Sequence, residues 1–257
     1  MSVILTYDGS FAGWLSAVFY TYERKANTVQ IAKSGTTQGD AFAQVIEIIT
    51  ESAKARRVWT GLLKKLSATA ADRIYYCFLS ELPEVEDMLL RFVKHVFANA
   101  ESVEDDFSNP DVLAVTQLAR KVWREKHRME AFVRFQQLKD DMYYSAVEPD
   151  HNVLPLIAKH FKSRYADQHW LIYDIHREYG IQYHPSEGFV TEVTFNWEDV
   201  KTAARPQTSV LSEREELYQL LWKDYFKNTG IPARKNLQLH IRHVPKRYWK
   251  HLTEKRL

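Results

Sequence analysis

Apolar side chains recur at helical spacing through most of the first half of this chain, and the pattern changes beyond residue 142. The residues that carry the i, i+3, i+4 rhythm across residues 40–100 are Phe42, Val45, Ile49, Val58, Leu62 and Leu66. We therefore expect three or four helices there, one of them opened by Pro83. Before them, residues 3–7 predict a short strand, which the turn at Asp8, Gly9 and Ser10 joins to a helix.

A second helical pattern follows an acidic joint at residues 102–110. Asn109 is expected to cap this helix and Pro110 to open it, and the apolar periodicity continues to about Leu138. We place the main boundary at this joint, which gives domains 1–105 and 106–257, and the two parts also suit one compact unit.

Strand-like patterns appear beyond this helix. Strands are predicted at residues 142–147, 170–183, 189–195 and 237–242, and helices or helical turns at residues 152–165, 212–230 and 246–252. The helix after residue 212 begins at a capping-box pattern formed by Ser212 and Glu215. These runs predict an α+β fold that is helix-rich, with an N-terminal strand and helical part followed by a mixed helix and antiparallel-sheet part.

Composition limits the chemistry of this chain. Of its 257 residues 45% are hydrophobic, and the only cysteine is Cys77, which excludes an internal disulfide and an all-cysteine zinc or iron–sulfur site. No histidine pair has the HxxxH or HxH spacing of zinc sites, so we expect neither a metal nor a cofactor. The first residues show no basic leader, and no apolar run approaches the roughly 20 residues that span a bilayer. We expect a cytoplasmic protein that is not embedded in a membrane.

Positive charge is concentrated near the C-terminus, although the net charge is only +2. Residues 233–257 contain one acid, Glu254, and eight cations: Arg234, Lys235, Arg242, Lys246, Arg247, Lys250, Lys255 and Arg256. Tyr248 and Trp249 lie among them, and a basic surface with flat rings suits a phosphate backbone with stackable bases. The alternative is a charged tail in which Trp249 and Leu252 dock on the core, and that arrangement still leaves the cations facing outward.

The helix predicted from residue 111 to 138 carries a second basic stretch. Its apolar side is formed by Val115, Leu118, Val122, Met129 and Val133, and its opposite side by Arg120, Arg124, His127 and Arg134. Only Glu125 and Glu130 are available to pair with the cations along this helix, so most are left for another partner, unless the face is simply solvated. The predicted nucleic-acid-binding residues are Arg120, Arg124, His127, Arg128, Arg134, Arg242, Lys246, Arg247, Trp249 and Lys250.

Asp150 and His151 join a predicted strand to a predicted helix, a position where open sheets present functional side chains. They suggest a second hypothesis, in which they are the acid and base of an enzyme acting on damaged DNA. The structural alternative is that Asp150 or Asn152 caps the helix and that His151 forms a hydrogen bond at the turn. The turn at residues 8–10 is likewise explained by a helix cap, because it lacks the lysine of a phosphate-binding loop.

Several motifs together resemble a bacterial family labelled "probable DNA metabolism protein". They are YDGSF at residues 7–11, HRM at 127–129, FVRF at 132–135, EPDHNVLP at 148–155, DQHWLIYD at 167–174, RKNL at 234–237 and PKRYWK at 245–250. The resemblance implies a companion of a radical-SAM protein of DNA modification or repair, and a similar domain precedes some uracil-DNA glycosylase modules. It assigns no catalytic residues. Because radical-SAM chemistry needs three cysteines, any cluster would belong to the partner.

The leading hypothesis is a non-catalytic DNA-binding accessory protein in DNA repair or modification. In it, the helix 111–138 and the stretch 237–252 form one basic face, and phosphate contacts supply the affinity. A third hypothesis makes the chain a scaffold whose basic face binds the radical-SAM partner without touching DNA.

Overall fold

The structure is a computed structural model that describes residues 3–24, 29–36, 43–194, 211, 212, 214–228 and 236–255. The chain divides into two compact units, Met1–Trp123 and Arg124–Leu257. This division falls inside one long helix, and the boundary at residue 105 expected from the sequence stays a prediction. None of the described helices has the length and apolar character needed to cross a membrane.

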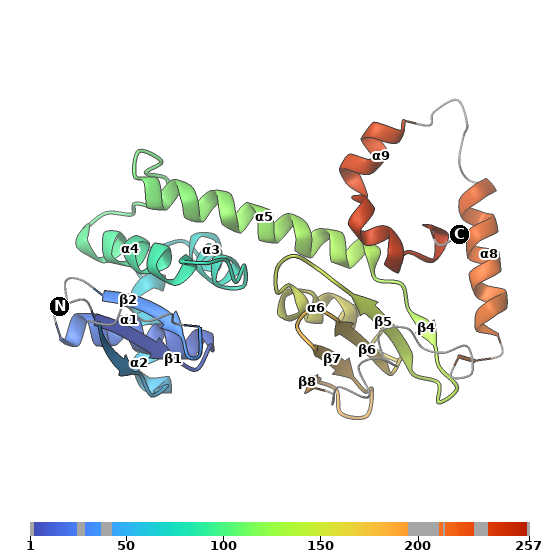
Figure 1. The fold of residues 1–257 in the computed structure, drawn as a ribbon, viewed down its shortest axis with the longest axis horizontal. Helices are drawn as coiled ribbons and strands as arrows, with labels where there is room; N and C mark the ends of the chain where they lie inside the picture. The colour runs from blue at the N-terminus through green and yellow to red at the C-terminus, as the bar shows by residue number, and fades with distance from the viewer. Residues whose placement is uncertain are drawn as a thin grey trace. The chain divides into compact units, whose positions relative to one another are not determined.

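The first unit begins with a three-stranded sheet that is entirely parallel (Figure 1). Its strands are β1 (Val3–Tyr7), β2 (Val29–Lys33) and β3 (Gln44–Glu47), with β1 in the centre. The predicted strand, turn and helix are confirmed, because α1 (Phe11–Glu23) follows β1 and the Ser10 hydroxyl accepts a hydrogen bond from the Gly13 amide at 2.9 Å.

The helical pattern expected from residue 40 is wrong at its start. Val45 lies in β3, where it is 55% exposed, and Ile49 is 80% exposed in a loop, so neither lies on the apolar face of a helix. Phe42 lies outside the described residues. The pattern failed because β3 is an edge strand with little burial, and its pairing with β1 is a contact distant in sequence.

Three helices follow, as the sequence predicts. They are α2 (Ser52–Leu63), α3 (Ala68–Phe78) and α4 (Val85–Ala98), and the last begins two residues after Pro83. Val58, Leu62 and Leu66 are buried in the core of the first unit, which also contains the fully buried Trp14. Cys77 is buried in the same core, and burial raises the pKa of its thiol to about 12.

The long helix α5 (Pro110–Phe132) begins where the sequence predicts. The Asn109 side-chain oxygen accepts hydrogen bonds from the amides of Asp111 and Val112, at 2.9 and 3.3 Å. All five residues of its predicted apolar side are buried: Val115, Leu118, Val122, Met129 and Val133. The helix ends before the predicted residue 138, because the chain turns there into a second sheet.

The second unit is built on a mixed five-stranded sheet in the order β4-β5-β6-β7-β8. The strands are β4 (Gln136–Gln137), β5 (Tyr143–Val147), β6 (Trp170–Asp174), β7 (Tyr179–Tyr183) and β8 (Val190–Thr194). The pair β5 and β6 is parallel, since α6 (Leu154–Arg164) crosses between them, and the other pairs are antiparallel as expected. Gly180 is required in β7, because a Cβ atom there would lie 2.9 Å from the carbonyl oxygen of Ile172.

Helix α8 (Glu215–Asn228) begins near the predicted capping box, but the box is not formed. The Glu215 carboxylate instead accepts hydrogen bonds from the Gln137 amide and from the Gln219 side chain, both at 2.9 Å. The Ser212 hydroxyl is buried without a hydrogen-bond partner in the described structure. A contact with β4 therefore replaces the local cap.

The strand predicted at residues 237–242 is wrong, because this stretch forms helix α9 (Leu237–His243). The Asn236 side chain accepts a hydrogen bond from the Leu239 amide at 3.0 Å, which caps the helix. The predicted closing turn is confirmed as the 3-10 helix η3 (Lys246–His251), which a second short 3-10 helix, η4 (Thr253–Lys255), follows. The α+β class is confirmed, with helices and strands in largely separate runs.

Candidate nucleic-acid interface

The C-terminal half of α5 lies beside the last part of the chain within the second unit (Figure 1). We call residues 236–255, which contain α9, η3 and η4, the C-terminal segment. Nη2 of Arg128 on α5 donates a hydrogen bond to the carbonyl oxygen of Arg242 on α9 at 3.4 Å, across 114 residues of sequence. The ring centroids of Phe132 and Tyr248 are 5.4 Å apart. Two stretches that are remote in sequence therefore share one surface.

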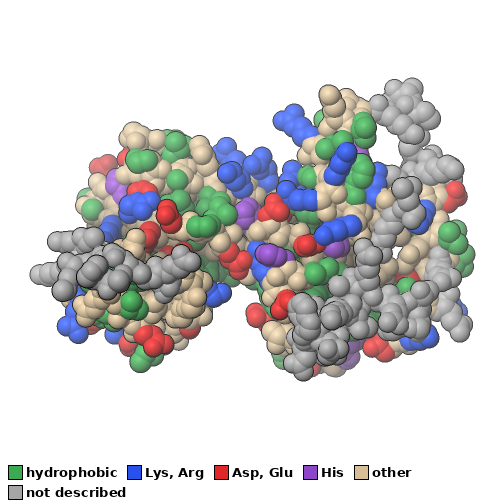
Figure 2. Space-filling view, viewed as in Figure 1, with side chains coloured by type: hydrophobic (Ala, Val, Ile, Leu, Met, Phe, Trp, Pro, Cys, Tyr) green, Lys and Arg blue, Asp and Glu red, His purple; other side chains and the backbone are tan. Residues whose placement is uncertain are grey.

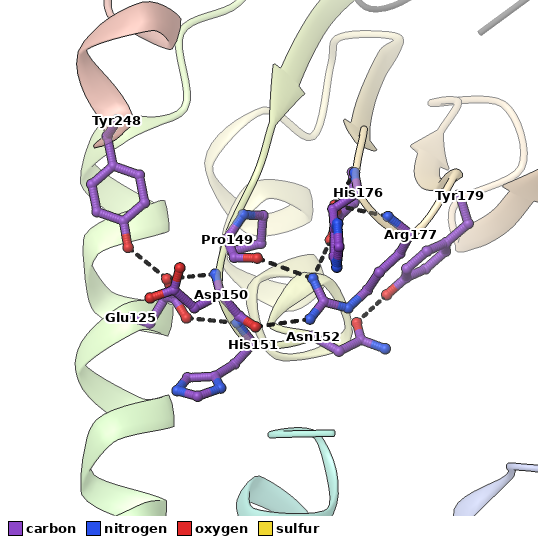
Figure 3. A network of polar contacts seen from close by, with 10 residues as sticks. Glu125, Pro149, Asp150, His151, Asn152, His176, Arg177, Tyr179 and Tyr248 are labelled. Atoms are coloured by element: carbon purple, nitrogen blue, oxygen red, sulfur yellow. Dashed lines mark hydrogen bonds and ion pairs between the residues drawn. The ribbon is translucent and has the colours of Figure 1, made fainter. Parts of the chain in front are cut away.

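A buried carboxylate on α5 connects these two stretches (Figure 3). Glu125 is 2% exposed, and its Oε1 accepts hydrogen bonds from the Tyr248 hydroxyl at 2.5 Å and from Arg247 Nη2 at 3.1 Å. Tyr248 is also 2% exposed, and its burial together with the charge of Glu125 raises the pKa of its phenol. Tyr248 and Leu252 dock the C-terminal segment, whereas the sequence predicted Trp249 and Leu252.

The same carboxylate organises the loop between β5 and α6. The amide of Asp150 donates to Glu125 Oε1 at 2.9 Å, and the amide of His151 donates to Oε2 at 2.8 Å. The expectation that Asp150 or Asn152 caps α6 is wrong, because the N-cap residue is Val153 and it forms no side-chain cap. Glu125 satisfies loop amides in place of a local cap.

An arginine supports this loop from the other side (Figure 3). Arg177 Nη1 donates to the carbonyl oxygen of Pro149 at 3.1 Å, and Nη2 donates to that of Asp150 at 3.0 Å. Nη1 also lies 2.8 Å from Oδ2 of the buried Asp174, which fixes the guanidinium. Further along the loop, the Tyr179 hydroxyl donates to the side-chain oxygen of Asn152. Arg177 thus donates hydrogen bonds to the carbonyl oxygens of the loop, and Glu125 accepts hydrogen bonds from its amides.

Asp150 and His151 lie in this supported loop, where the Asp150 carboxylate has a cationic partner. Asp150 Oδ2 pairs with Arg247 Nη2 at 2.8 Å, so its carboxylate is already engaged with a cation. Neither residue lines the cavity at the end of α5 or the groove beside α6. No group of three or more histidine, cysteine or carboxylate side chains suited to a metal ion occurs in the described ranges.

Two further acids pair with predicted site residues. Arg134 forms hydrogen bonds with both oxygens of Glu254, at 2.8 and 3.3 Å, and Trp222 Nε1 donates to the same carboxylate at 2.9 Å. Lys250 pairs with Glu148, and His251 Nε2 lies 3.4 Å from that carboxylate. Burial raises the pKa of both carboxyls, but these partners outweigh it and leave each pKa below its ordinary value of 4.5.

Other predicted site residues have exposed charges. Arg124 on α5, Arg242 on α9 and Lys246 on η3 are exposed, and among the described residues none of the three forms an ion pair with an acid. Figure 2 shows lysine and arginine side chains over α5 and α9. His127 is exposed and lies 3.5 Å from Glu130, and Arg120 is exposed in the part of α5 that belongs to the first unit. Arg234, Lys235 and Arg256 lie outside the described residues.

Trp249 lies between two lysines. The Lys246 and Lys255 ammonium groups are 5.9 and 5.2 Å from the centre of its ring, and its Nε1 donates to the carbonyl oxygen of Val244 at 2.9 Å. Because α9 is a helix, His240 and Arg242 do not share the single face that the predicted strand gave them. His240 instead faces the Trp249 ring, with centroids 6.0 Å apart.

A family model described as a domain of unknown function, DUF4130, matches residues 83–254, which include α5, the second sheet and all but the last residue of the C-terminal segment. The chain belongs to this family. No curated protein matches the sequence. Among solved structures, a pGpG-specific phosphodiesterase, PggH, from Vibrio cholerae is 12% identical with a TM-score of 0.37, over 71% of this chain and 81% of that one. The expected links to DNA metabolism and to a radical-SAM partner stay predictions.

Sequence reasoning missed the residues that hold the DUF4130 domain together at this site. The sequence analysis treats Glu125 only as an acid that can pair with the cations of the helix, and it does not single out Arg177. The one available signal was the position of Glu125 on the helix, since it falls outside the narrow basic band and next to the apolar side.

Proposed function

We propose that this chain binds DNA through a basic face on its second unit and acts as a non-catalytic accessory protein in DNA repair or modification. The basic face consists of Arg124, His127, Arg128, Arg134, Arg242, Lys246, Arg247, Trp249 and Lys250. The observation that carries the proposal is the contact of Arg128 with the Arg242 carbonyl, which brings the cations of α5 and the C-terminal segment onto one surface. Clustered arginines and lysines suit the evenly spaced charges of a phosphate backbone.

The residues of the basic face divide into two groups in this proposal. Arg134, Arg247 and Lys250 pair with acids of the same unit, so they position the C-terminal segment more than they add charge. The phosphate contacts come from Arg124, Arg128, Arg242 and Lys246, because none of these four forms an ion pair with an acid in the described part of the chain. Trp249 is half-buried and has the Lys246 and Lys255 ammonium groups near its ring, and the exposed part of this ring is available to an unpaired base.

The radical-SAM companion belongs to the same proposal. Cys77 is buried and the sequence has no other cysteine, so any iron–sulfur cluster of such a pathway belongs to the companion. The chain would then deliver or hold DNA for chemistry performed by another protein. A pull-down of the companion with and without nuclease separates direct protein contact from a DNA bridge.

The experiment that tests DNA binding uses two variants with the same change in net charge. Arg124→Glu combined with Arg242→Glu is expected to weaken binding of a fluorescent oligonucleotide at least about tenfold, since two phosphate contacts become repulsive. Arg56→Glu combined with Lys64→Glu places the same charges on exposed positions of the first unit and is expected to bind as the wild type does. Equal weakening of both variants, or no binding by the wild type to single- or double-stranded DNA, would reject the proposal.

A further inference from the structure

The second unit contains a cavity of about 1100 Å³ that adjoins the basic face and shares only Arg134 with it. Its walls come from the end of α5, strands β4 to β6, helix α6, the first turns of α8, and η4. Ligand sites for small molecules commonly enclose about 300–1000 Å³, so this cavity has room for a nucleotide.

Aromatic rings form much of the wall. Phe135 contacts Phe161 and Tyr165 edge to face, with ring centroids 5.7 and 5.4 Å apart, and Phe161 lies 6.2 Å from Trp170. Helix α8 adds Tyr218, which is 53% exposed. Phe161 and Trp170 are buried, whereas Phe135 and Tyr165 are half-buried, so these two rings and Tyr218 offer stacking surfaces for a flat ligand.

Polar groups in the wall favour a heteroaromatic ligand over a hydrocarbon. Trp170 is fully buried, and its Nε1 has no hydrogen-bond partner among the described residues. A buried indole N–H without an acceptor is costly, so a ligand that brings a carbonyl oxygen or a ring nitrogen would satisfy it. Gln137, Gln168 and Gln219 also line the cavity. The NH₂ groups of Gln137 and Gln219 each donate one hydrogen bond, to Asp141 and Glu215, and each carboxamide keeps an oxygen acceptor and a second N–H for the edge of a nucleobase.

Besides Arg134, which pairs with Glu254, the cavity has cations on its α6 side. A shallow groove adjoins it and shares the lining residues Glu130, His160 and Arg164. The groove adds Lys159, and both Lys159 and Arg164 are exposed on α6. The Arg164 guanidinium also lies 5.8 Å from the centre of the Tyr165 ring, so it connects the aromatic wall to the groove.

Two carboxylates line the cavity, and both have partners. Glu130 pairs with Lys126 at 2.5 Å and lies 3.6 Å from His160 Nδ1. Glu215 accepts hydrogen bonds from Gln137 and Gln219. A phosphate is therefore expected on the α6 side, near Lys159 and Arg164, and away from Glu215.

We propose that this cavity binds one nucleotide, with the base stacked among the aromatic rings and its phosphate on Lys159 and Arg164. The nucleotide is either part of a DNA strand or free in solution, and only the first source rests on the proposed function. If the nucleotide is part of a DNA strand, its base leaves the base stack and enters the cavity, while the neighbouring phosphates contact the cations of the basic face. The site involves no covalent step.

The test is calorimetric titration of the full chain with dAMP, dGMP, dCMP and dTMP, with inorganic phosphate and deoxyadenosine as partial probes. At least one nucleotide is expected to bind more tightly than either partial probe. Tyr218→Ala and Arg164→Gln are each expected to weaken that binding about fivefold or more. Leu217→Ala on α8 and Lys162→Gln on α6 replace neighbours that do not line the cavity, so both variants are expected to bind the nucleotide with unchanged affinity.

A further variant tests the indole N–H without removing its ring. Trp170→Phe is expected to weaken binding of the preferred nucleotide several-fold and to change the preference among the four bases. A purely structural role of Trp170 would leave that preference unchanged. Circular dichroism compares its folding with that of the wild type. No nucleotide binding, binding no tighter than that of phosphate, or unchanged affinity in Tyr218→Ala and Arg164→Gln would overturn the proposal.

The basic-face variant distinguishes this inference from the proposed function. Arg124→Glu combined with Arg242→Glu is expected to bind mononucleotides normally, and loss of that binding would place the nucleotide on the basic face and overturn the cavity site. If mononucleotides bind but oligonucleotides do not, the cavity takes a free nucleotide and DNA binding fails. An oligonucleotide that displaces the mononucleotide supports a base of the strand as the occupant.

Discussion

Glu125 links three parts of the second unit through one side chain. Its carboxylate accepts hydrogen bonds from the amides of Asp150 and His151 and from the side chains of Arg247 and Tyr248. A carboxylate that is 2% exposed requires such donors, because burial removes its hydration. Since two donors come from the β5–α6 loop and two from the C-terminal segment, the position of the basic face depends on this residue.

The substitution Glu125→Gln is expected to destabilise the second unit. It replaces one acceptor oxygen with an NH₂ group, and leaving buried donors unpaired lowers the free energy of unfolding by about 3 kcal/mol. Hydrogen–deuterium exchange checks the site of the effect, because the amides of Asp150 and His151 should lose protection. Glu192→Gln, an exposed change on β8, serves as the control. Unchanged protection of both amides would show that Glu125 does not hold the loop.

At the scale of elements, the sequence predicted those whose signals are local. The start of α5 was correct because Asn109 and Pro110 act within one helical turn. The strand predicted from the alternation of Leu237, Leu239 and Ile241 is wrong. This alternation spans only five residues, and the cap formed by Asn236 favours a helix over a strand. Strands β2 and β3 depend on pairing with β1, which is distant in sequence, and no local pattern predicts that pairing. The helix position of Glu125 indicates that it lies near the apolar side, but its partner Tyr248 is also distant in sequence and could not be predicted.

Helix α9 gives a direct test of capping. Asn236→Ala removes the side-chain acceptor of the Leu239 amide, and we expect α9 to lose about 1 kcal/mol of stability. Faster hydrogen–deuterium exchange across α9 measures this loss. Gln238→Ala lies in the same helix, is exposed, and keeps the cap, so it should exchange no faster than the wild type. Similar exchange in both variants would contradict the role of the cap.

The docking of the C-terminal segment is expected to depend on pH. Glu148 and Glu254 have pKa values lowered by their partners, so they contribute stability above an ordinary pKa of 4.5 and lose it as the pH falls through their folded values. Limited proteolysis should therefore cut the C-terminal segment faster at pH 3.5 than at pH 7. In the double variant Glu148→Gln and Glu254→Gln, cleavage at pH 7 should already be fast. A segment equally resistant at both pH values would contradict this mechanism.

At the scale of the whole molecule, charge distribution matters more than total charge. A net charge of +2 gives little long-range attraction for DNA, so affinity must come from the local surface where α5 meets the C-terminal segment. The ion pairs of Arg134, Arg247 and Lys250 cost that surface some of its charge. They also keep the segment in place, which fixes the four remaining cations in one arrangement.

This arrangement predicts how strongly salt weakens DNA binding. Neutralisation of four phosphates by Arg124, Arg128, Arg242 and Lys246 gives a slope of log K against log salt of about −3.6 for duplex DNA. Arg242→Gln should reduce its magnitude by about 1, because one fewer counterion is released on binding. Arg56→Gln, on the first unit, should leave the slope unchanged. The measurement is fluorescence anisotropy of a labelled duplex over a series of salt concentrations. A slope near zero, or an equal change in both variants, would mean that the basic face does not contact the phosphate backbone.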